Sequence, residues 1–464
     1  TEGPVRLSNR EVTIPATDKA EWIRSEFGLT ANGSTDWPQP LGDYRRLQTQ
    51  PRTFSGLAER WQASMFEIAD ALYADEYNPL LKEFVDLYER AHARFLKLNS
   101  TMIPASTAIT SGTMVYVRTP LSIRAYEIST GKLIWEAGRP ERQLRSWADA
   151  RNAMNRDPSR VSVPLETNPI DPRGLLFDQM LRTNTAFQMS ISGGTLYSVE
   201  ESSGASWTDS MRLGIGNGAE GMPPTNYIRA YDAKTGLFLW EAGGQTQNAN
   251  PALRSSGQPN LLAGHYFLGA PLVLGRRIYV LAESGEGIFL IRLGEPDPLN
   301  PKSSPVVLAS QLISVPRSRL SAHPLRKHAG LIPSFAQGLL ICPTCDDRII
   351  AVSAEDLSIR WIFRYAGILR LQEIGGDSLV LFGGRDFQDT SRIDRDNRWI
   401  DFLPRISGDR VFLTPRDADQ LYCLDLQTGK ELWKTKSPDP TSVENGYAMT
   451  GAPLIANGVV VVGV

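Results

Sequence analysis

Short runs of β-forming residues recur along this chain, each beside a glycine-containing turn. Their alternating or continuous apolar pattern is typical of strands buried on at least one face. Apolar residues in 65–98 instead recur every three or four positions, which predicts a helix that Asn78-Pro79 divides into two pieces, with Pro79 in the first turn of the second. The β-forming runs lie at 111–117, 192–199, 274–281, 337–342 and 407–413.

A ten-residue pattern follows four of these runs: an apolar strand end, usually an acidic residue, then Thr-Gly and a short strand that ends in tryptophan. This pattern predicts a hairpin whose glycine adopts positive φ, while a side chain such as Asp232 or Asp425 accepts hydrogen bonds from turn N–H groups. Leu357 replaces the glycine in one copy, so we expect a different turn there. The four copies end at Trp135, Trp240, Trp361 and Trp433.

Each unit therefore has four short strands, the content of a propeller blade. One such unit cannot bury both faces of its sheet, so neighbouring units must stack around an axis. The third unit is degenerate, and Leu308 stands in the place of tryptophan. The sequence predicts an all-β fold: a β-propeller of four-stranded blades, with at least five visible, a partial sixth from Gly451, and an N-terminal helical segment.

The tryptophans occupy one regular position, on the last strand of each hairpin, which favours packing between blades over a stacking platform for a ligand. We expect Trp240 in particular to be buried. Outside the blades, 139–185 is an insertion with alternating arginines and acidic residues, which is either a solvated helical face or a partner-docking site. The long loop at 244–264 is a second candidate for partner binding.

The chain divides into three predicted regions. Residues 1–58 form an extended segment that wraps the propeller, residues 59–104 form a ring-closing strand and a helical insertion, and residues 105–464 form the propeller. We expect the propeller to be incomplete at its C-terminal end, because an unpaired valine-rich strand favours aggregation.

With its Asp-x-x-Thr-Gly-x-x-x-Trp signature, the chain resembles the pyrroloquinoline-quinone-like (PQQ-like) β-propeller repeat family from about Trp37 to its end. Residues 36–39 resemble the Trp-Pro-Gln opening of planctomycete members, and Arg60-Trp61 resembles the first strand, which closes the ring against the last blade. The resemblance implies an extracytoplasmic protein of one of two kinds. Quinoprotein dehydrogenases bind PQQ and calcium on the propeller axis, whereas the lipoprotein of the outer-membrane barrel-assembly machinery is a non-catalytic scaffold. The fold alone does not decide between them.

The composition bears on which classes of partner and fold the chain can have. Lysine and arginine number 49 against 51 acidic residues, a formal net charge of −2, which gives no general attraction to nucleic acid or anionic lipid. No apolar run reaches the roughly 18 to 20 residues that span a bilayer. Three cysteines exclude a fold built on disulfides.

Cys342-Pro-Thr-Cys345 has the spacing of a redox or metal pair. It ends a predicted strand, and Cys423 and four scattered histidines do not complete a zinc site, so we interpret these cysteines as structural or incidental. His323 and His328 lie five positions apart around Pro324, which does not suit a helical metal pair. We expect an exposed basic loop there, which also includes Arg317 and Arg319.

Two further segments resemble ligand loops. Asp394, Asp396, Asn397 and Asp401 are spaced somewhat like a calcium loop, but Trp399 and Arg405 occupy the positions of its glycine and glutamate. We interpret them as a charged loop between strands. The glycine-rich stretch 214–218 precedes a proline pair and a strand instead of a helix, so it is interpreted as a loop and not a phosphate site.

The resemblance to quinoprotein dehydrogenases would require an adjacent Cys-Cys pair against the quinone, and the sequence has none. We therefore assign no catalytic, cofactor-binding or metal-binding residue. The leading hypothesis is a non-catalytic scaffold that mediates protein-protein interaction in the bacterial cell envelope through its blade insertions. Two alternatives stay open: a fragment of a PQQ-dependent dehydrogenase with calcium, or a propeller that binds a small molecule or glycan.

Overall fold

Within the part of the chain that the structure describes, the strands form six antiparallel sheets, five of them blades with at least four strands. The computed structural model describes residues 43–45, 59–64, 79–86, 89, 108–138, 184–201, 225–244, 262–294, 296, 305–320, 323, 326–327, 329–365, 403–415, 418, 420–435, 450–456 and 459–463.

Four blades are meanders whose four strands pair in chain order. Blade 1 has β1 (Ile109–Ser111), β2 (Met114–Arg118), β3 (Ile123–Glu127) and β4 (Leu133–Ala137). Blade 2 has β5 (Met189–Ser192), β6 (Thr195–Glu201), β7 (Asn226–Asp232) and β8 (Phe238–Gly243), and α5 (Asn184–Phe187) precedes it. Blade 4 has β14 (Ser334–Ala336), β15 (Leu339–Pro343), β16 (Arg348–Ser353) and β17 (Ile359–Arg364). Blade 5 has β18 (Arg405–Ser407), β19 (Arg410–Leu413), β20 (Tyr422–Asp425) and β21 (Glu431–Lys434).

Blade 3 has the same meander with one addition, because β9 (Tyr266–Phe267) pairs with β11. Its other strands are β10 (Leu272–Leu274), β11 (Arg277–Ser284), β12 (Gly287–Gly294) and β13 (Val306–Ser314). The sixth sheet consists of β22 (Thr450–Ala456) and β23 (Val459–Gly463). This confirms the degenerate third unit and the partial sixth blade.

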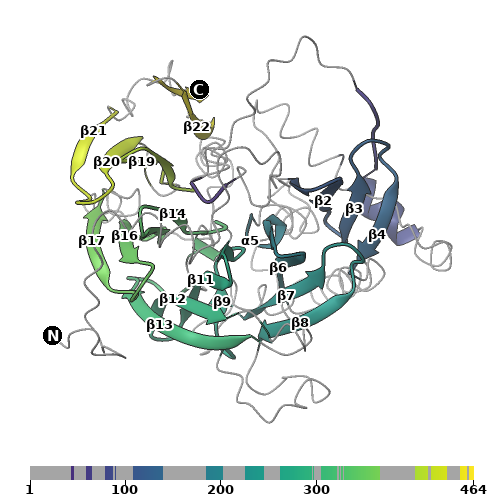
Figure 1. Ribbon diagram of the computed structural model, residues 1–464, viewed down its shortest axis with the longest axis horizontal. Coiled ribbons are helices and arrows are strands. Elements are labelled where there is room, and N and C mark those ends of the chain that lie inside the picture. Colours follow the sequence, from purple (N-terminus) through teal and green to yellow (C-terminus); the bar gives the residue numbers. More distant parts are fainter. Residues whose placement is uncertain are drawn as a thin grey trace, which may run out of the picture.

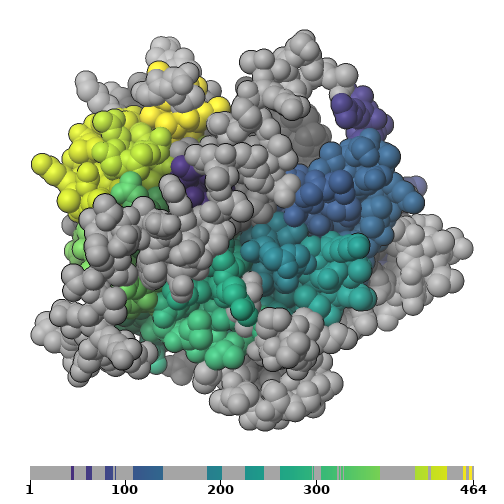
Figure 2. All heavy atoms as spheres, in the orientation of Figure 1, coloured from purple at the N-terminus to yellow at the C-terminus, as the bar shows by residue number. Residues whose placement is uncertain are grey.

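The sheets follow one another around a common centre in chain order, from blue β2–β4 through teal and green to yellow β19–β22 (Figure 1). The last strands of the blades, β4, β8, β13, β17 and β21, form the perimeter, and Figure 2 shows the side chains of neighbouring blades in contact along this arc. The predicted β-propeller is confirmed. The helix that the sequence predicts after Pro79 is present over 79–86, where Phe84 is fully buried; most of 65–98 lies outside the described residues.

Two of the repeated tryptophans join their blade to the next one. The Trp135 indole N–H donates to the carbonyl of Ala233 at 3.0 Å, and that of Trp361 donates to Leu426 at 2.9 Å. Each acceptor lies three residues before the turn glycine of the following blade, and the indole covers that glycine. A Cβ atom added to Gly429 would lie 2.4 Å from Trp361 Cδ2. Glycine is therefore needed both for its positive φ and for the close approach of the ring.

Trp61 extends the same arrangement to blade 1. Its indole N–H donates to the Ile128 carbonyl at 2.9 Å, and a Cβ on Gly131 would collide with its ring. It also stacks on Tyr126, with ring centroids 5.8 Å apart. Residues 59–64 therefore stand against blade 1 as an outer strand would. The expected role of Arg60-Trp61, closing the ring against the last blade, stays a prediction.

The junction of blades 3 and 4 corrects two expectations. The register pairs Arg292 with Ala309 and leaves Leu308 in the bulge, so Ala309 and not Leu308 holds the tryptophan position. Leu357 does not change the turn: its φ is 58°, and its N–H donates to Ser353 at 2.9 Å as the glycines do in their turns. Without an indole to cover it, this turn position accommodates a buried leucine.

Other side chains replace the missing indole. The residue paired with tryptophan is Ala125 in blade 1, Ala230 in blade 2 and Ala351 in blade 4, whereas Arg292 takes this place in blade 3. Arg292 donates to the carbonyl of Glu355 at 2.8 Å, and the Tyr279 hydroxyl donates to that of Ala354 at 3.0 Å. The Ala354 carbonyl is the equivalent of the one that receives an indole N–H elsewhere. The alanine-tryptophan pair has thus become an arginine-alanine pair.

We expect Gly429→Ala to lower the free energy of unfolding by about 1 to 2 kcal/mol from left-handed strain, plus about 1 to 3 kcal/mol from collision with Trp361. Gly408→Ala is the matched control, because Gly408 has a similar φ of 61° with nothing within 4 Å of an added Cβ. Urea unfolding of both variants isolates the collision. Equal losses for the two would contradict the account of Trp361.

Candidate functional site

Most of the buried charged side chains gather at one end of the blades. In a meander of four strands the first and third turns lie at one end, and the second turn lies at the other with the connection to the next blade. The Thr-Gly hairpins are third turns. Glu200 and Glu283 are near the ends of the second strands, and Asp346 lies in a second turn. Arg326 belongs to the connection between β13 and β14.

The Glu200 cluster joins blades 1 and 2. The carboxylate of Glu200 lies 2.6 Å from Arg229 Nη1 and 3.5 Å from Arg118 Nη1. It also accepts hydrogen bonds from the hydroxyls of Tyr231 at 2.7 Å and Ser198 at 3.0 Å. Arg118 comes from blade 1 and the other members from blade 2, so the cluster fixes the two blades relative to one another.

The surroundings of Glu200 keep it ionised. Burial alone would raise the pKa of its carboxyl, but Arg118 and Arg229 together with the two hydroxyl donors outweigh burial and lower the pKa to about 2. Burial and the neighbouring carboxylate raise the pKa of Tyr231. Neither group exchanges a proton at neutral pH, so this cluster is suited to holding the blades and not to acid-base catalysis.

The Arg326 cluster fixes the connection between blades 3 and 4. Arg326 is fully buried and forms a bidentate ion pair with Glu283, at 2.7 Å from Nε and 3.0 Å from Nη2. Its Nη2 also donates to the Ser318 carbonyl at 2.6 Å, and its Nη1 lies 3.9 Å from Asp346. Burial raises the pKa of both Glu283 and Asp346, against the opposing effect of the guanidinium.

His323 is part of this cluster, and it corrects the prediction of an exposed loop. The side chain is buried, and its Nδ1 accepts a hydrogen bond from the backbone N–H of Arg326 at 3.1 Å. Burial and the nearby guanidinium lower its pKa to about 3, so the ring is neutral across the physiological range. Pro324 lies outside the described residues, as does His328.

We expect His323 to make the folded protein less stable in acid. Its pKa is about 3 in the folded protein and ordinarily 6.5, so its contribution is present above pH 6.5 and declines as pH falls toward 3. Between pH 7.5 and 4.5 we expect the wild type to lose about 2 to 3 kcal/mol more than His323→Asn, which keeps an acceptor but does not titrate. Parallel urea unfolding at the two pH values measures this difference, and equal losses would contradict it.

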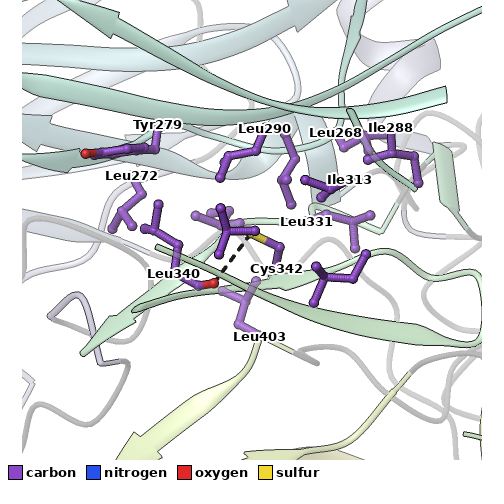
Figure 3. Close-up of a cluster of buried hydrophobic side chains, with 14 of the residues drawn as sticks. Leu268, Leu272, Tyr279, Ile288, Leu290, Ile313, Leu331, Leu340, Cys342 and Leu403 are labelled. Atoms are coloured by element: carbon purple, nitrogen blue, oxygen red, sulfur yellow. Dashed lines mark hydrogen bonds between the residues drawn. The ribbon is translucent and has the colours of Figure 1, made fainter. Parts of the chain in front are cut away.

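The Cys-Pro-Thr-Cys segment lies in the core between blades 3 and 4. Cys342 lies near the end of β15, as predicted, and its side chain is surrounded by apolar residues of both blades (Figure 3). Burial raises the pKa of the Cys342 thiol, which makes it a poor nucleophile. Cys345 and Cys423 are also buried, and none of the three cysteines forms a disulfide in the structure. The structural interpretation fits this environment.

Several predicted features lie outside the described residues: the possible calcium loop at 394–401, the glycine-rich stretch 214–218, and most of the insertions 139–185 and 244–264. The ion-pair clusters were missed by the sequence analysis. Their signal was a single acidic residue near the end of an apolar strand, as with Glu283 in Arg277–Ser284. Within the described ranges, no group of three His, Cys, Asp or Glu side chains is placed to hold a metal ion. No helix among those residues is long and apolar enough to cross a membrane.

Comparison with known proteins gives short sequence matches and distant structural ones. Over 55 residues the chain is 47% identical to lanthanide-dependent methanol dehydrogenase of Methylacidiphilum fumariolicum (strain SolV), covering 12% of this chain and 8% of that protein. BamB from Moraxella catarrhalis matches with 11% identity and a TM-score of 0.35, over 71% of this chain and 62% of that one. Quinohemoprotein alcohol dehydrogenase from Comamonas testosteroni matches with 13% identity and a TM-score of 0.38, over 90% and 50%.

The chain spans less than two thirds of the length of each of these proteins. The family match is likewise local and lies at the C-terminal blades. Residues 396–463, which include blade 5 and the partial sixth blade of this β-propeller, match the PQQ-like repeat family described as outer membrane protein assembly factor BamB.

Proposed function

We propose that this chain is a non-catalytic β-propeller scaffold that binds other proteins in the bacterial cell envelope. One surface carries the proposal, the outer edge of blade 3. Val306, Leu308 and Leu312 alternate along the exposed face of β13, and Val315 follows the strand. Their side chains are 62%, 48%, 37% and 61% exposed, respectively. The exposed Ser310 lies between Leu308 and Leu312, and a row of mostly apolar exposed side chains of this kind is typical of a protein interaction site.

Comparison with the other perimeter strands sets β13 apart. β4 and β8 each contain a glutamate, β17 contains two arginines, and β21 contains Glu431 and Lys434. Charges on an edge strand oppose unwanted pairing. β13 has nine residues and no charge. Its long uncharged edge is what we expect where a partner normally covers the strand.

The buried clusters support a scaffold role as well. Their charges fix blades and a connection relative to one another, which gives a rigid body on which loops and edges present binding surfaces. The match to a family named for an assembly factor agrees with protein partners and with an extracytoplasmic location. The net charge of −2 gives no support to nucleic acid binding.

Leu308→Lys should reduce recovery of co-purifying envelope proteins at least tenfold, because a charged side chain in the apolar row must be desolvated against the partner. The matched control is Ile134→Lys, at the corresponding bulge position of blade 1, where the side chain is 45% exposed. Tagged full-length chains from the native host, compared by quantitative mass spectrometry, test this. Equal recovery with both variants would contradict a binding role for β13.

The main alternative is a fragment of a PQQ-dependent dehydrogenase, which has the support of the 55-residue match to a methanol dehydrogenase. Two observations speak for the scaffold over that cofactor and its calcium ion. Among the described residues no group of three His, Cys, Asp or Glu side chains is placed to hold a metal, and the sequence lacks an adjacent cysteine pair. We therefore propose that no cofactor is bound. A propeller that binds a small molecule or glycan is a further alternative, which a melting-temperature screen against sugars addresses.

A further inference from the structure

A short N-terminal segment lies inside the ring. Asp43, Tyr44 and Arg45 appear as the purple piece beside β14 near the centre of Figure 1. The Tyr44 carbonyl accepts a hydrogen bond from the N–H of Phe335 on β14 at 2.9 Å. The carbonyl of Arg45 accepts one from the N–H of Ile406 on β18 at 3.1 Å. Two consecutive carbonyls therefore bind the innermost strands of two different blades.

Side chains contribute further interactions to this contact. The Tyr44 ring meets the Phe335 ring edge to face, with centroids 5.8 Å apart, a favourable aromatic geometry. The Asp43 carboxylate accepts from the backbone N–H of Arg45 at 3.0 Å and pairs with its guanidinium at 3.1 Å. The Arg45 guanidinium carbon also lies 5.7 Å from the centre of the Tyr44 ring. Contacts between its own side chains thus stabilise the turn in addition to its contacts with the blades.

The propeller residues that bind the turn belong to the buried core. Phe335 is fully buried, and the Ser334 hydroxyl donates to the Pro404 carbonyl, which ties the inner strands of blades 4 and 5 together. In contrast, the Arg45 and Asp43 side chains are 36% and 19% exposed. A partly exposed turn held on a buried surface by backbone hydrogen bonds and a ring contact resembles a ligand on a receptor.

We propose that the inner edges of β14 and β18 form a peptide-recognition site for a tight turn with an aromatic side chain, which this chain's own Asp43-Tyr44-Arg45 occupies in cis. Covalent attachment gives the turn a high effective concentration, so a free peptide competes poorly until the turn is removed. A partner protein would enter with a turn of the same chemistry. This step rests on the proposed binding function, although its test uses only this chain.

The test uses the full chain with Asp43→Ala and Tyr44→Ala combined, and a fluorescent peptide of residues 38–50. We expect the peptide to bind the double variant at least tenfold more tightly than wild type, as read by anisotropy. The same peptide with alanine at both positions should not bind. The Phe335 and Ile406 amides should exchange at least tenfold faster in the variant alone, with protection restored by the peptide.

Peptide binding to neither chain, or equal binding to both, would overturn the proposal. Unchanged exchange of the two amides in the variant would overturn it as well. Leu308→Lys, placed on the same double variant, should leave peptide affinity unchanged, because β13 is at the perimeter. Failure of the peptide test would therefore leave the β13 surface standing, and failure at β13 would leave the peptide site standing.

Discussion

Replacing Trp361 by alanine should lower the free energy of unfolding by about 3 to 5 kcal/mol. Its side chain is 9% exposed, its ring covers Gly429, and its indole N–H donates a hydrogen bond to the Leu426 carbonyl of the next blade. Truncation would leave a cavity between blades 4 and 5 and a carbonyl without its donor. Urea or thermal unfolding of the purified variant gives the value.

The repeat supplies its own control. Trp433 occupies the same position on β21, but its side chain is 38% exposed. Trp433→Ala should therefore cost about 1 kcal/mol, because much less apolar area returns to water. Similar losses at the two positions would mean that the repeated tryptophans act within a blade and not between blades.

Glu283→Gln should cost about 3 to 5 kcal/mol, because it removes the carboxylate that forms the bidentate pair with the buried Arg326 guanidinium and leaves only Asp346, at 3.9 Å, to balance its charge. The same chemical change at Glu431, which faces Lys434 at 3.6 Å on the surface, should cost less than about 1 kcal/mol. Unfolding in urea at pH 7 compares the two. Replacing both Glu283 and Arg326 by methionine should recover most of the stability, since an apolar pair leaves neither of the two charges buried without its partner. A double variant as unstable as the single one would contradict this interpretation.

The repeated part of the fold was predictable because its signals are local. A glycine before a β-forming run, and Thr-Gly before a tryptophan, specify hairpins within about ten residues, and their recurrence specifies stacking. Trp240 is buried as expected, and the Asp232 and Asp425 side chains accept from the N–H groups of Thr235 and Thr428.

What escaped prediction depends on strand register and on contacts between distant residues. Placing Ala309 in the tryptophan position requires the bulge that skips Leu308, which no linear alignment reveals. Leu357 suits its turn only because Arg292, sixty-five positions earlier, replaces an indole that blocks the same place elsewhere.

The polar clusters escaped for the same reason. Arg326 looked like part of an exposed basic loop, since the sequence does not show that Glu283 lies beside it after the chain has passed through β12 and β13. The contact of Tyr44 with Phe335 joins segments almost three hundred residues apart. No local pattern marks such a contact.

The most direct test of a scaffold without a cofactor is titration of the purified full-length protein with PQQ, together with calcium or a lanthanide. Absorbance, melting temperature and dye-linked alcohol oxidation would be followed together. We predict no saturable change in the spectrum, no shift in melting temperature and no turnover. Saturable binding with oxidation of an alcohol would contradict the account and make this chain part of a quinoprotein dehydrogenase.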